Sequence, residues 1–288
     1  MNVLQDAFTA LSVGSVYGVV GAGYVIIHRI TGMVNFTQGD LAMAGAFGAV
    51  VAASWMPTGA AMAVGAVVGA IAGLLVYVLA VHPLRNQGLL VQIIATLGAA
   101  IVLRSIAQLI FGTEPYSLDP LTAGPPVRVA GASMPRQVLW LVAIMVLLYI
   151  ALKAFFDHTM VGRAMSACAI NRYAAGVVGI NVVAMAALAF TISGGITGLI
   201  GAVQVPLGFA TAAFGLPLGL KGFIAAILGG FDKIGLAMFG GILVGFLESF
   251  FAANVSTVYQ EVIVFGLLLV LLIARPAGLT RMRVSERV

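Results

Sequence analysis

Five ionisable side chains stand within strongly apolar stretches of this sequence: Asp40, Arg104, Lys221, Glu248 and Glu261. A charge at the centre of a bilayer costs roughly 2.5–3.5 kcal/mol on insertion scales, so such groups usually face a bundle interior or a watery path. Each can equally belong to an ion pair between helices, and Lys221 and Glu248 form a plausible pair of this kind. These positions are therefore candidates for solute translocation or for structural pairing.

A cluster of polar residues leads up to Asp40. It reads Asn35-Phe36-Thr37-Gln38-Gly39-Asp40, and a helical apolar segment follows. One interpretation is a broken helix whose positive N-terminal end lines a cavity. The other is a loop at the membrane edge, with Asp40 as a helix cap. Our first candidates for a substrate pathway are Asn35, Gln38 and Asp40, and the second are Lys221 and Glu248.

Familiar catalytic patterns are missing from the sequence. It contains no G-x-x-x-x-G-K-[ST] phosphate loop, no H-E-x-x-H and no G-x-S-x-G. A single cysteine, Cys168, excludes an intrachain disulfide and a Cys-rich metal site. We therefore expect no catalytic residue, no metal ligand and no cofactor on this chain.

The composition indicates a membrane protein. The 288 residues are 62% hydrophobic and 8% charged, with a mean hydropathy of +1.15. Soluble domains are about 45–50% apolar and about 25% charged. The composition therefore excludes a soluble enzyme, and its hydrophobicity excludes a disordered chain.

Apolar segments of about 20 residues predict an all-α bundle of eight or nine transmembrane helices in one domain over 1–288. The segments are 8–27, 40–56, 59–81, 89–111, 137–155, 184–205, 212–230, 235–253 and 258–274. The segment 212–230 contains Pro217, Gly219 and Gly222, so it can be a broken or re-entrant helix. Glycines at four-residue spacing, such as Gly65/Gly69/Gly73 and Gly194/Gly198, favour close packing within one bundle over specific dimer contacts.

The basic residues predict the orientation. With the N-terminus outside and the C-terminus in the cytoplasm, ten Lys or Arg fall in cytoplasmic segments and two, Arg128 and Arg136, fall outside. The net charge of +5 is then a topology signal and does not indicate nucleic-acid binding. The Pro-rich loop 113–136 is expected to be a rigid external cap, and the loop 156–181 to be cytoplasmic.

The cytoplasmic loop contains signals for a short helix. Asn171 is a good N-cap and Gly179 sits where a C′ glycine belongs, about two turns later. Tyr173, Val177 and Val178 are expected to be partly exposed. An apolar helix has no reason to stand in water, so it either lies on the membrane or docks onto another protein.

The residues of this loop resemble a known family. The pattern G-R-A-x-x-A…N…A-A…G-I-N over 162–181 resembles the ATPase-coupling loop of ATP-binding-cassette (ABC) importer permeases, and more narrowly that of branched-chain amino acid permeases. Further matches in chain order are Asn35–Gly39 with Met43–Ala46, Gly219–Phe223 with Leu228–Gly230, and Gly235–Glu248 with Arg275–Leu279. Gln38 stands where many members carry histidine, and Phe47 where tyrosine is common. These two differences concern the identity of the substrate more than the transport mechanism.

The resemblance implies a permease subunit of a bacterial inner-membrane importer that moves branched-chain or related amino acids by alternating access. Its implied partners are a second homologous permease, two cytoplasmic ATPases that hold ATP and Mg²⁺, a periplasmic binding protein, and membrane lipid. The residues implied in ATPase coupling are Arg163, Asn171, Arg172, Tyr173, Ala175, Gly179 and Asn181. The alternative is a stand-alone ion-coupled secondary transporter, with Asp40 or Glu248 titrating.

Overall fold

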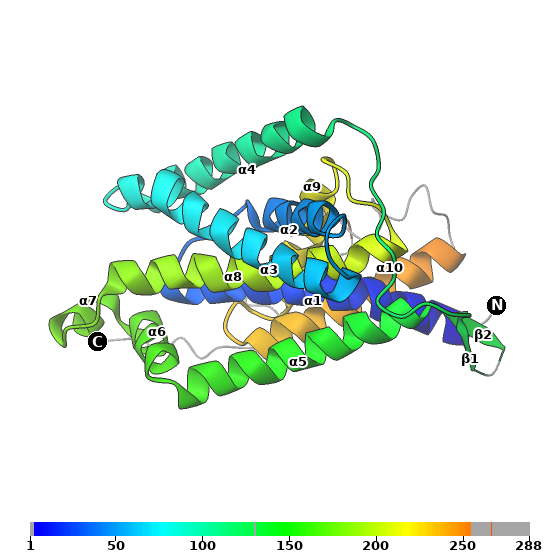
Figure 1. Ribbon diagram of the computed structural model, residues 1–288. Coiled ribbons are helices and arrows are strands. Elements are labelled where there is room, and N and C mark those ends of the chain that lie inside the picture. The colour runs from blue at the N-terminus through cyan, green and yellow to red at the C-terminus, as the bar shows by residue number, and fades with distance from the viewer. Residues whose placement is uncertain (1–2, 130, 255–265, 267–288) are drawn as a thin grey trace.

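The computed structural model describes residues 3–129, 131–254 and 266, and these are mostly helical (Figure 1). Within the described residues, six helices are long and apolar enough to cross a membrane. They are α1 (Val3–Thr31), α3 (Thr58–Val76), α4 (Leu89–Phe111), α5 (Arg136–His158), α8 (Val182–Gln204) and α10 (Ile234–Asn254). The chain is therefore a polytopic, helical membrane protein, as its composition predicts.

Two further helices occupy predicted spans but are shorter than expected. α2 (Gln38–Ala52) has 15 residues and α9 (Gly215–Leu228) has 14. At 1.5 Å per residue they rise about 22 and 21 Å, less than the roughly 30 Å hydrocarbon core. The predicted span 258–274 lies outside the described residues. The count of eight or nine spans therefore stays a prediction.

Glycine faces hold the long helices together. α3 packs along α8, where a Cβ atom on Gly69 would collide with the carbonyl oxygen of Gly194, and one on Gly194 with that of Gly69. α1 packs along α10 in the same way, with a Cβ atom on Gly18 placed 3.0 Å from Cα of Met238. The prediction that these glycines pack one bundle is confirmed for both helix pairs.

The two ends of the bundle carry different structures (Figure 1). At one end the loop between α4 and α5 forms an antiparallel hairpin of β1 (Val127–Val129) and β2 (Ala132–Met134), the single exception to the all-α prediction in the described ranges. At the other end, α6 (Met160–Ile170) and α7 (Arg172–Val177) connect α5 to α8. Short turns follow two long helices: η1 (Tyr77–Val81) and η2 (His82–Leu84) follow α3, and η3 (Val205–Leu207) follows α8.

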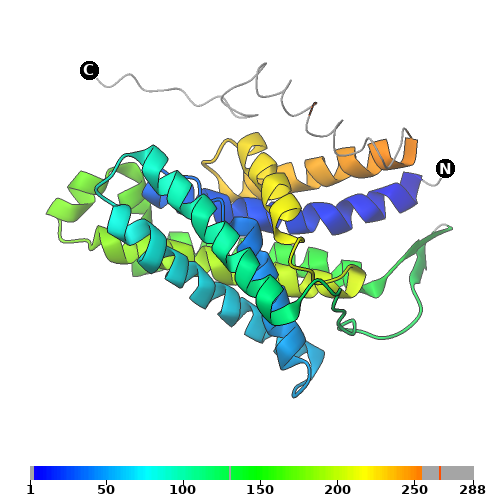
Figure 2. The same cartoon turned by 90° about the horizontal axis from the view of Figure 1, so that it is seen from above.

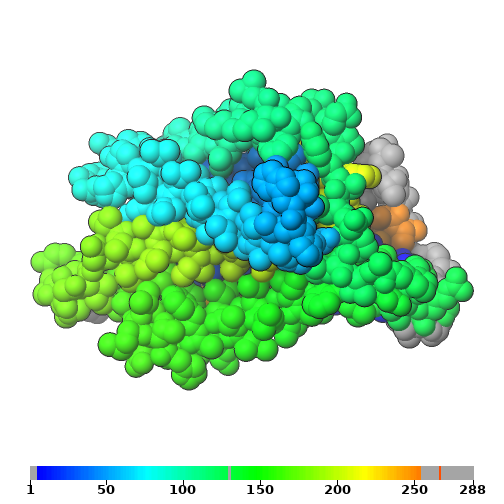
Figure 3. Space-filling model, viewed as in Figure 1, coloured from blue at the N-terminus to red at the C-terminus, as the bar shows by residue number. Residues whose placement is uncertain are grey.

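α4 lies on the outside of the bundle (Figure 2). Most of its apolar side chains are exposed, while Thr96, Ala100 and Ala107 are buried. An apolar cavity of about 420 Å³ separates part of α4 from α2 and α3, and this face is hollowed there (Figure 3). Such a surface suits lipid or another membrane subunit rather than water.

Candidate functional site

The chain turns back into the bundle after α1. Gly32 adopts φ 68°, which glycine tolerates, and the following Met33, Asn35 and Thr37 are buried. Nε2 of Gln38, the first residue of α2, donates to Oγ of Ser193 at 2.8 Å, midway along α8. The segment 35–40 is therefore enclosed by the protein rather than an exposed loop, because α2 begins beside the middle of α8.

A closed hydrogen-bond network fixes this re-entering segment. Oδ1 of Asn35 accepts from the backbone N and Oγ1 of Thr37 at 3.2 and 2.7 Å. Nε2 of Gln38 also donates to Oγ1 of Thr197, and Oγ of Ser193 donates to the carbonyl oxygen of Gly23 at 3.0 Å. All five side chains are fully buried, so Asn35 and Gln38 are brought together as supports of the fold rather than as exposed ligands. Sequence reasoning missed Ser193 and Thr197, although two hydroxyls four residues apart on one predicted span share a helix face.

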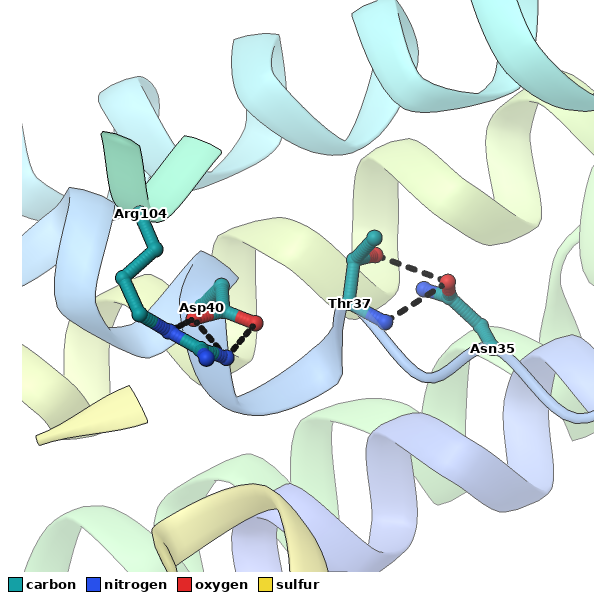
Figure 4. Close-up of polar contacts among 4 residues, drawn as sticks. All are labelled: Asn35, Thr37, Asp40 and Arg104. Atoms are coloured by element: carbon teal, nitrogen blue, oxygen red, sulfur yellow. Dashed lines mark hydrogen bonds and ion pairs between the residues drawn. The ribbon is translucent and has the colours of Figure 1, made fainter. Parts of the chain in front are cut away.

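Asp40 pairs with Arg104 of α4 (Figure 4). Nε and Nη2 of Arg104 donate to Oδ1 of Asp40 at 3.2 and 3.1 Å, and Nη2 also donates to Oδ2 at 3.2 Å. The Asp40 side chain is 2% exposed and the Arg104 side chain 23%. Asp40 is therefore not a helix cap; its carboxylate lies behind a guanidinium that remains partly accessible.

The accessible side of Arg104 faces a cavity of about 370 Å³, which we call the Arg104 cavity. The phenol of Tyr24 and the ring of Phe36 form part of its wall, and α9 contributes Gly215 and Gly219. The remaining lining residues are aliphatic: Leu97, Ala100, Ile101, Leu216 and Leu220. Sequence reasoning noted Arg104 as a lone charge on a predicted span but did not place it in the pathway, because nothing in the sequence links it to Asp40.

The first turns of α2 and α9 meet beside this ion pair. A Cβ atom on Gly39 would lie 2.7 Å from Cα of Gly219, and one on Gly215 would lie 2.6 Å from Oδ1 of Asp40. Only glycine permits this approach, and it brings the positive ends of two short helices next to the Asp40 carboxylate. The predicted broken helix at 212–230 is therefore a short helix that starts within the bundle.

Lys221 and Glu248 form the expected pair between α9 and α10. Nζ of Lys221 lies 2.6 Å from Oε1 of Glu248, and both residues are buried. The same Nζ lies 5.5 Å from the centre of the Tyr17 ring on α1. Neither residue lines the Arg104 cavity. Their role in the pathway stays a prediction, and their geometry favours a stabilising contact among three helices. Glu261 lies outside the described residues.

The short helix predicted in the cytoplasmic loop is α7, and both of its caps are confirmed. Oδ1 of Asn171 accepts from the backbone N of Ala174 at 3.0 Å. Gly179 adopts φ 89°, its N–H donates to the carbonyl of Gly176, and the N–H of Ile180 donates to that of Ala175, which together make a Schellman motif. Asn181 caps the next helix, α8, by accepting from Ala184 N at 3.0 Å.

Three large apolar side chains are exposed on and just after α7. Tyr173 is 83% exposed, and Val177 and Val178 are exposed beside it, whereas Ala175 is buried against the bundle. We call Tyr173, Val177 and Val178 the α7 patch. Because all three leave large apolar surfaces uncovered at the end of the molecule, α7 has the form of a docking element.

The other predicted coupling residues lie around α7 rather than on its patch. Arg172 lines a cavity of about 210 Å³ together with Tyr77 and Arg85, so its side chain turns toward the bundle. Arg163 is exposed on α6, next to the buried Met165 and Cys168. Burial raises the pKa of the Cys168 thiol, which keeps it protonated and consistent with a packing role.

A larger, charged cavity of about 890 Å³ opens at the same end of the bundle as α6. The ends of α1 and α5, α6, and the turn between α9 and α10 line it. Its charged residues are Arg29, Lys153, Asp157, Asp232 and Lys233. The mixture of signs and its position at an end distinguish it from the mainly apolar Arg104 cavity.

Comparison with known proteins identifies the family. A family described as a branched-chain amino acid transport system permease component matches residues 7–272. The LivH permease protein of the high-affinity branched-chain amino acid transport system of Escherichia coli K12 is 33% identical, with 96% of this chain and 94% of LivH covered. The BraD permease protein of Pseudomonas aeruginosa is 30% identical over 96% of this chain and 95% of BraD.

More distant similarities agree with this result. The ribose import permease protein RbsC of Escherichia coli K12 is 25% identical over 90% of this chain and 82% of its own length. A solved inward-facing structure of a metal-chelate type ABC transporter shares the fold, with a TM-score of 0.52 and 15% identity over 93% of this chain and 85% of that one. Since the family match and the relatives cover nearly the whole sequence, this chain belongs to the branched-chain amino acid transport permease components, a family of transport subunits and not of enzymes.

Proposed function

We propose that this chain is a membrane-spanning subunit of an ATP-driven importer of branched-chain or closely related amino acids in a bacterial inner membrane. The observation that carries the proposal is membership of a permease family over residues 7–272, together with the capped, exposed helix α7. A second homologous permease, two cytoplasmic ATPases holding ATP and Mg²⁺, and a periplasmic binding protein complete the assembly. The whole of 1–288 acts as one permease domain.

The proposed orientation puts the N-terminus and the 113–136 loop outside and α6, α7 and the C-terminus in the cytoplasm. The distribution of ten basic residues against two supports it. The charged cavity at the end of α1, α5 and α6 then faces the ATPases, as does the α7 patch. Nine crossings, counting α2 and α9, fit this orientation, because an odd number of crossings puts the two termini on opposite sides of the membrane.

The proposed solute pathway runs past the Arg104 cavity. Arg104 faces the solute with Asp40 directly behind it, while Asn35 and Gln38 hold the segment that carries Asp40. Lys221 and Glu248 keep α9 in place beside α10. ATP-driven closure of the ATPases would move α7 and tilt the helices joined to it, which alternates access to the cavity. To shift the equilibrium between the two access states, the ATPases and the binding protein must each bind one state of the permease more tightly than the other.

The proposal is tested by reconstitution. The chain is co-expressed with its homologous partner subunits, purified through a tag on one ATPase, and placed in proteoliposomes with L-leucine and the binding protein. We expect co-purification and leucine uptake that requires ATP and is unaffected by a protonophore. Uptake by this chain alone, driven by a proton or sodium gradient, would instead establish the secondary-transporter alternative.

Tyr173→Ala is expected to uncouple ATP hydrolysis from uptake. The substitution removes the aromatic anchor of the α7 patch, which is 83% exposed, so the fold and the hydrolysis of ATP should persist. Leucine uptake per ATP hydrolysed should fall about tenfold, equivalent to about 1.4 kcal/mol of coupling. The matched control is Trp55→Ala, which removes another highly exposed aromatic side chain at the far end of α2. Wild-type uptake by Tyr173→Ala would show that α7 does not dock.

A further inference from the structure

We propose that Asp40 and Arg104 recognise the charged α-amino and α-carboxyl groups of a zwitterionic amino acid in the Arg104 cavity. The aliphatic and aromatic walls of the cavity receive its side chain. This inference rests on the proposed transport function and deepens it, because it assigns the solute-binding groups within the permease itself.

The cavity has the dimensions and walls of a small-molecule site. Its volume of about 370 Å³ falls at the lower end of ligand pockets, which span about 300–1,000 Å³. Apolar side chains dominate the lining, and Arg104 is the one charged residue among them. A compact solute with an aliphatic side chain and a charged head matches this lining, because the apolar walls would receive the side chain and Arg104 the charged head.

Arg104 retains capacity to bind a carboxylate. Its bonds to Asp40 use Nε and Nη2. Within the part of the chain that the structure describes, no hydrogen bond is made by Nη1, and the side chain keeps 23% of its surface exposed. A guanidinium can bind two planar carboxylates through different edges, which a lysine ammonium cannot do with the same geometry.

The electrostatic balance of the site favours a zwitterion over a singly charged solute. Asp40 and Arg104 together are neutral, and they lie in a bundle interior where an uncompensated charge is costly. A carboxylate without an amine adds a negative charge beside Asp40, and an amine without a carboxylate adds a positive charge beside Arg104. A zwitterion keeps the site neutral, because its carboxylate pairs with Arg104 and its ammonium with Asp40. The pair between Asp40 and Arg104 is then joined by two further charge contacts to the solute.

The surrounding backbone supports the same orientation of the solute. Gly215 and Gly219 of the first turns of α9 line the cavity, so its positive helix end faces the place of the bound carboxylate. The same glycines set Asp40 directly behind Arg104. Oδ2 of Asp40 accepts a single bond from Arg104, so a small movement of the guanidinium toward the solute would free this oxygen for the solute's ammonium.

The test measures saturable binding of radiolabelled L-leucine to the purified complex without the binding protein. The competitors are L-isoleucine, isocaproate, which lacks the amine of leucine, and isoamylamine, which lacks its carboxylate. We expect L-isoleucine to compete and the two singly charged analogues to compete at least about tenfold more weakly. Equal competition by either analogue, or no saturable leucine binding to the wild-type complex, would overturn the proposal.

Variants locate the recognition at the ion pair. The double variant Asp40→Asn/Arg104→Gln keeps the site neutral and hydrogen-bonded, and should weaken leucine binding by about tenfold or more. Arg104→Lys keeps the charge, loses the planar fork, and should give a smaller loss. The control Arg136→Gln removes an arginine charge away from the cavity, and should bind leucine within about twofold of wild type.

The outcomes separate this inference from the proposed function. ATP-driven leucine uptake by the wild-type complex, with unchanged leucine binding in Asp40→Asn/Arg104→Gln, would remove the role of the pair and leave the importer assignment standing. Absence of ATP-driven uptake by the wild-type complex would overturn the importer assignment. Gel filtration and basal ATP hydrolysis of each variant report whether its fold and assembly are intact.

Discussion

Gly69→Ala is expected to destabilise the folded chain by about 1–3 kcal/mol, the cost that is typical when a side chain is added to a tightly packed interior. Alanine ordinarily favours a helix over glycine by about 1 kcal/mol, so this substitution should stabilise an isolated helix. At this position the added methyl group would strike the carbonyl oxygen of Gly194 in the backbone of α8. Backbone cannot rotate away as a side chain can, so α3 and α8 must separate.

The matched control for this prediction is Gly98→Ala on α4. A Cβ atom at Gly98 meets no described atom within 4 Å, so the same change should be neutral or slightly stabilising. The measurement is the temperature at which each detergent-purified variant loses its gel-filtration peak. Equal midpoints for the two variants would show that α3 and α8 do not pack through these glycines.

Local features of the fold could be predicted from the sequence with accuracy. The apolar segment 89–111 coincides with α4, since bilayer thickness and helical rise together set its length. The caps of α7 were also predictable, because Asn171 and Gly179 each satisfy backbone groups only a few residues away. Such features depend on neighbours along the chain, which the sequence displays directly.

The candidate site depends on contacts between distant residues, and these were not predictable in the same way. Asp40 and Arg104 are separated by 64 positions, and nothing in either segment indicates the other. The polar residues Asn35 and Gln38 were correctly singled out as unusual, but the same polarity suits a pathway or a buried network. Only the positions of Ser193 and Thr197 show that Gln38 is enclosed by partners.

Lys221→Met is expected to have the largest effect on stability, about 3–5 kcal/mol, because it removes the cation that pairs with the buried carboxylate of Glu248. Nζ of Lys221 lies 2.6 Å from Oε1 of Glu248, and both residues are less than a tenth exposed. Methionine fills a similar volume, so the loss reflects charge rather than a cavity. The thermal midpoint of the purified complex measures it.

Lys221→Met/Glu248→Gln should recover most of this loss, because exchanging both charges for uncharged groups of similar volume is often close to neutral. The same double variant also separates two roles for the pair. A purely stabilising contact predicts that leucine uptake recovers together with the thermal midpoint. Recovered stability without uptake would place Lys221 and Glu248 in the solute pathway, and would mean that α9 and α10 each contribute a charged group to transport.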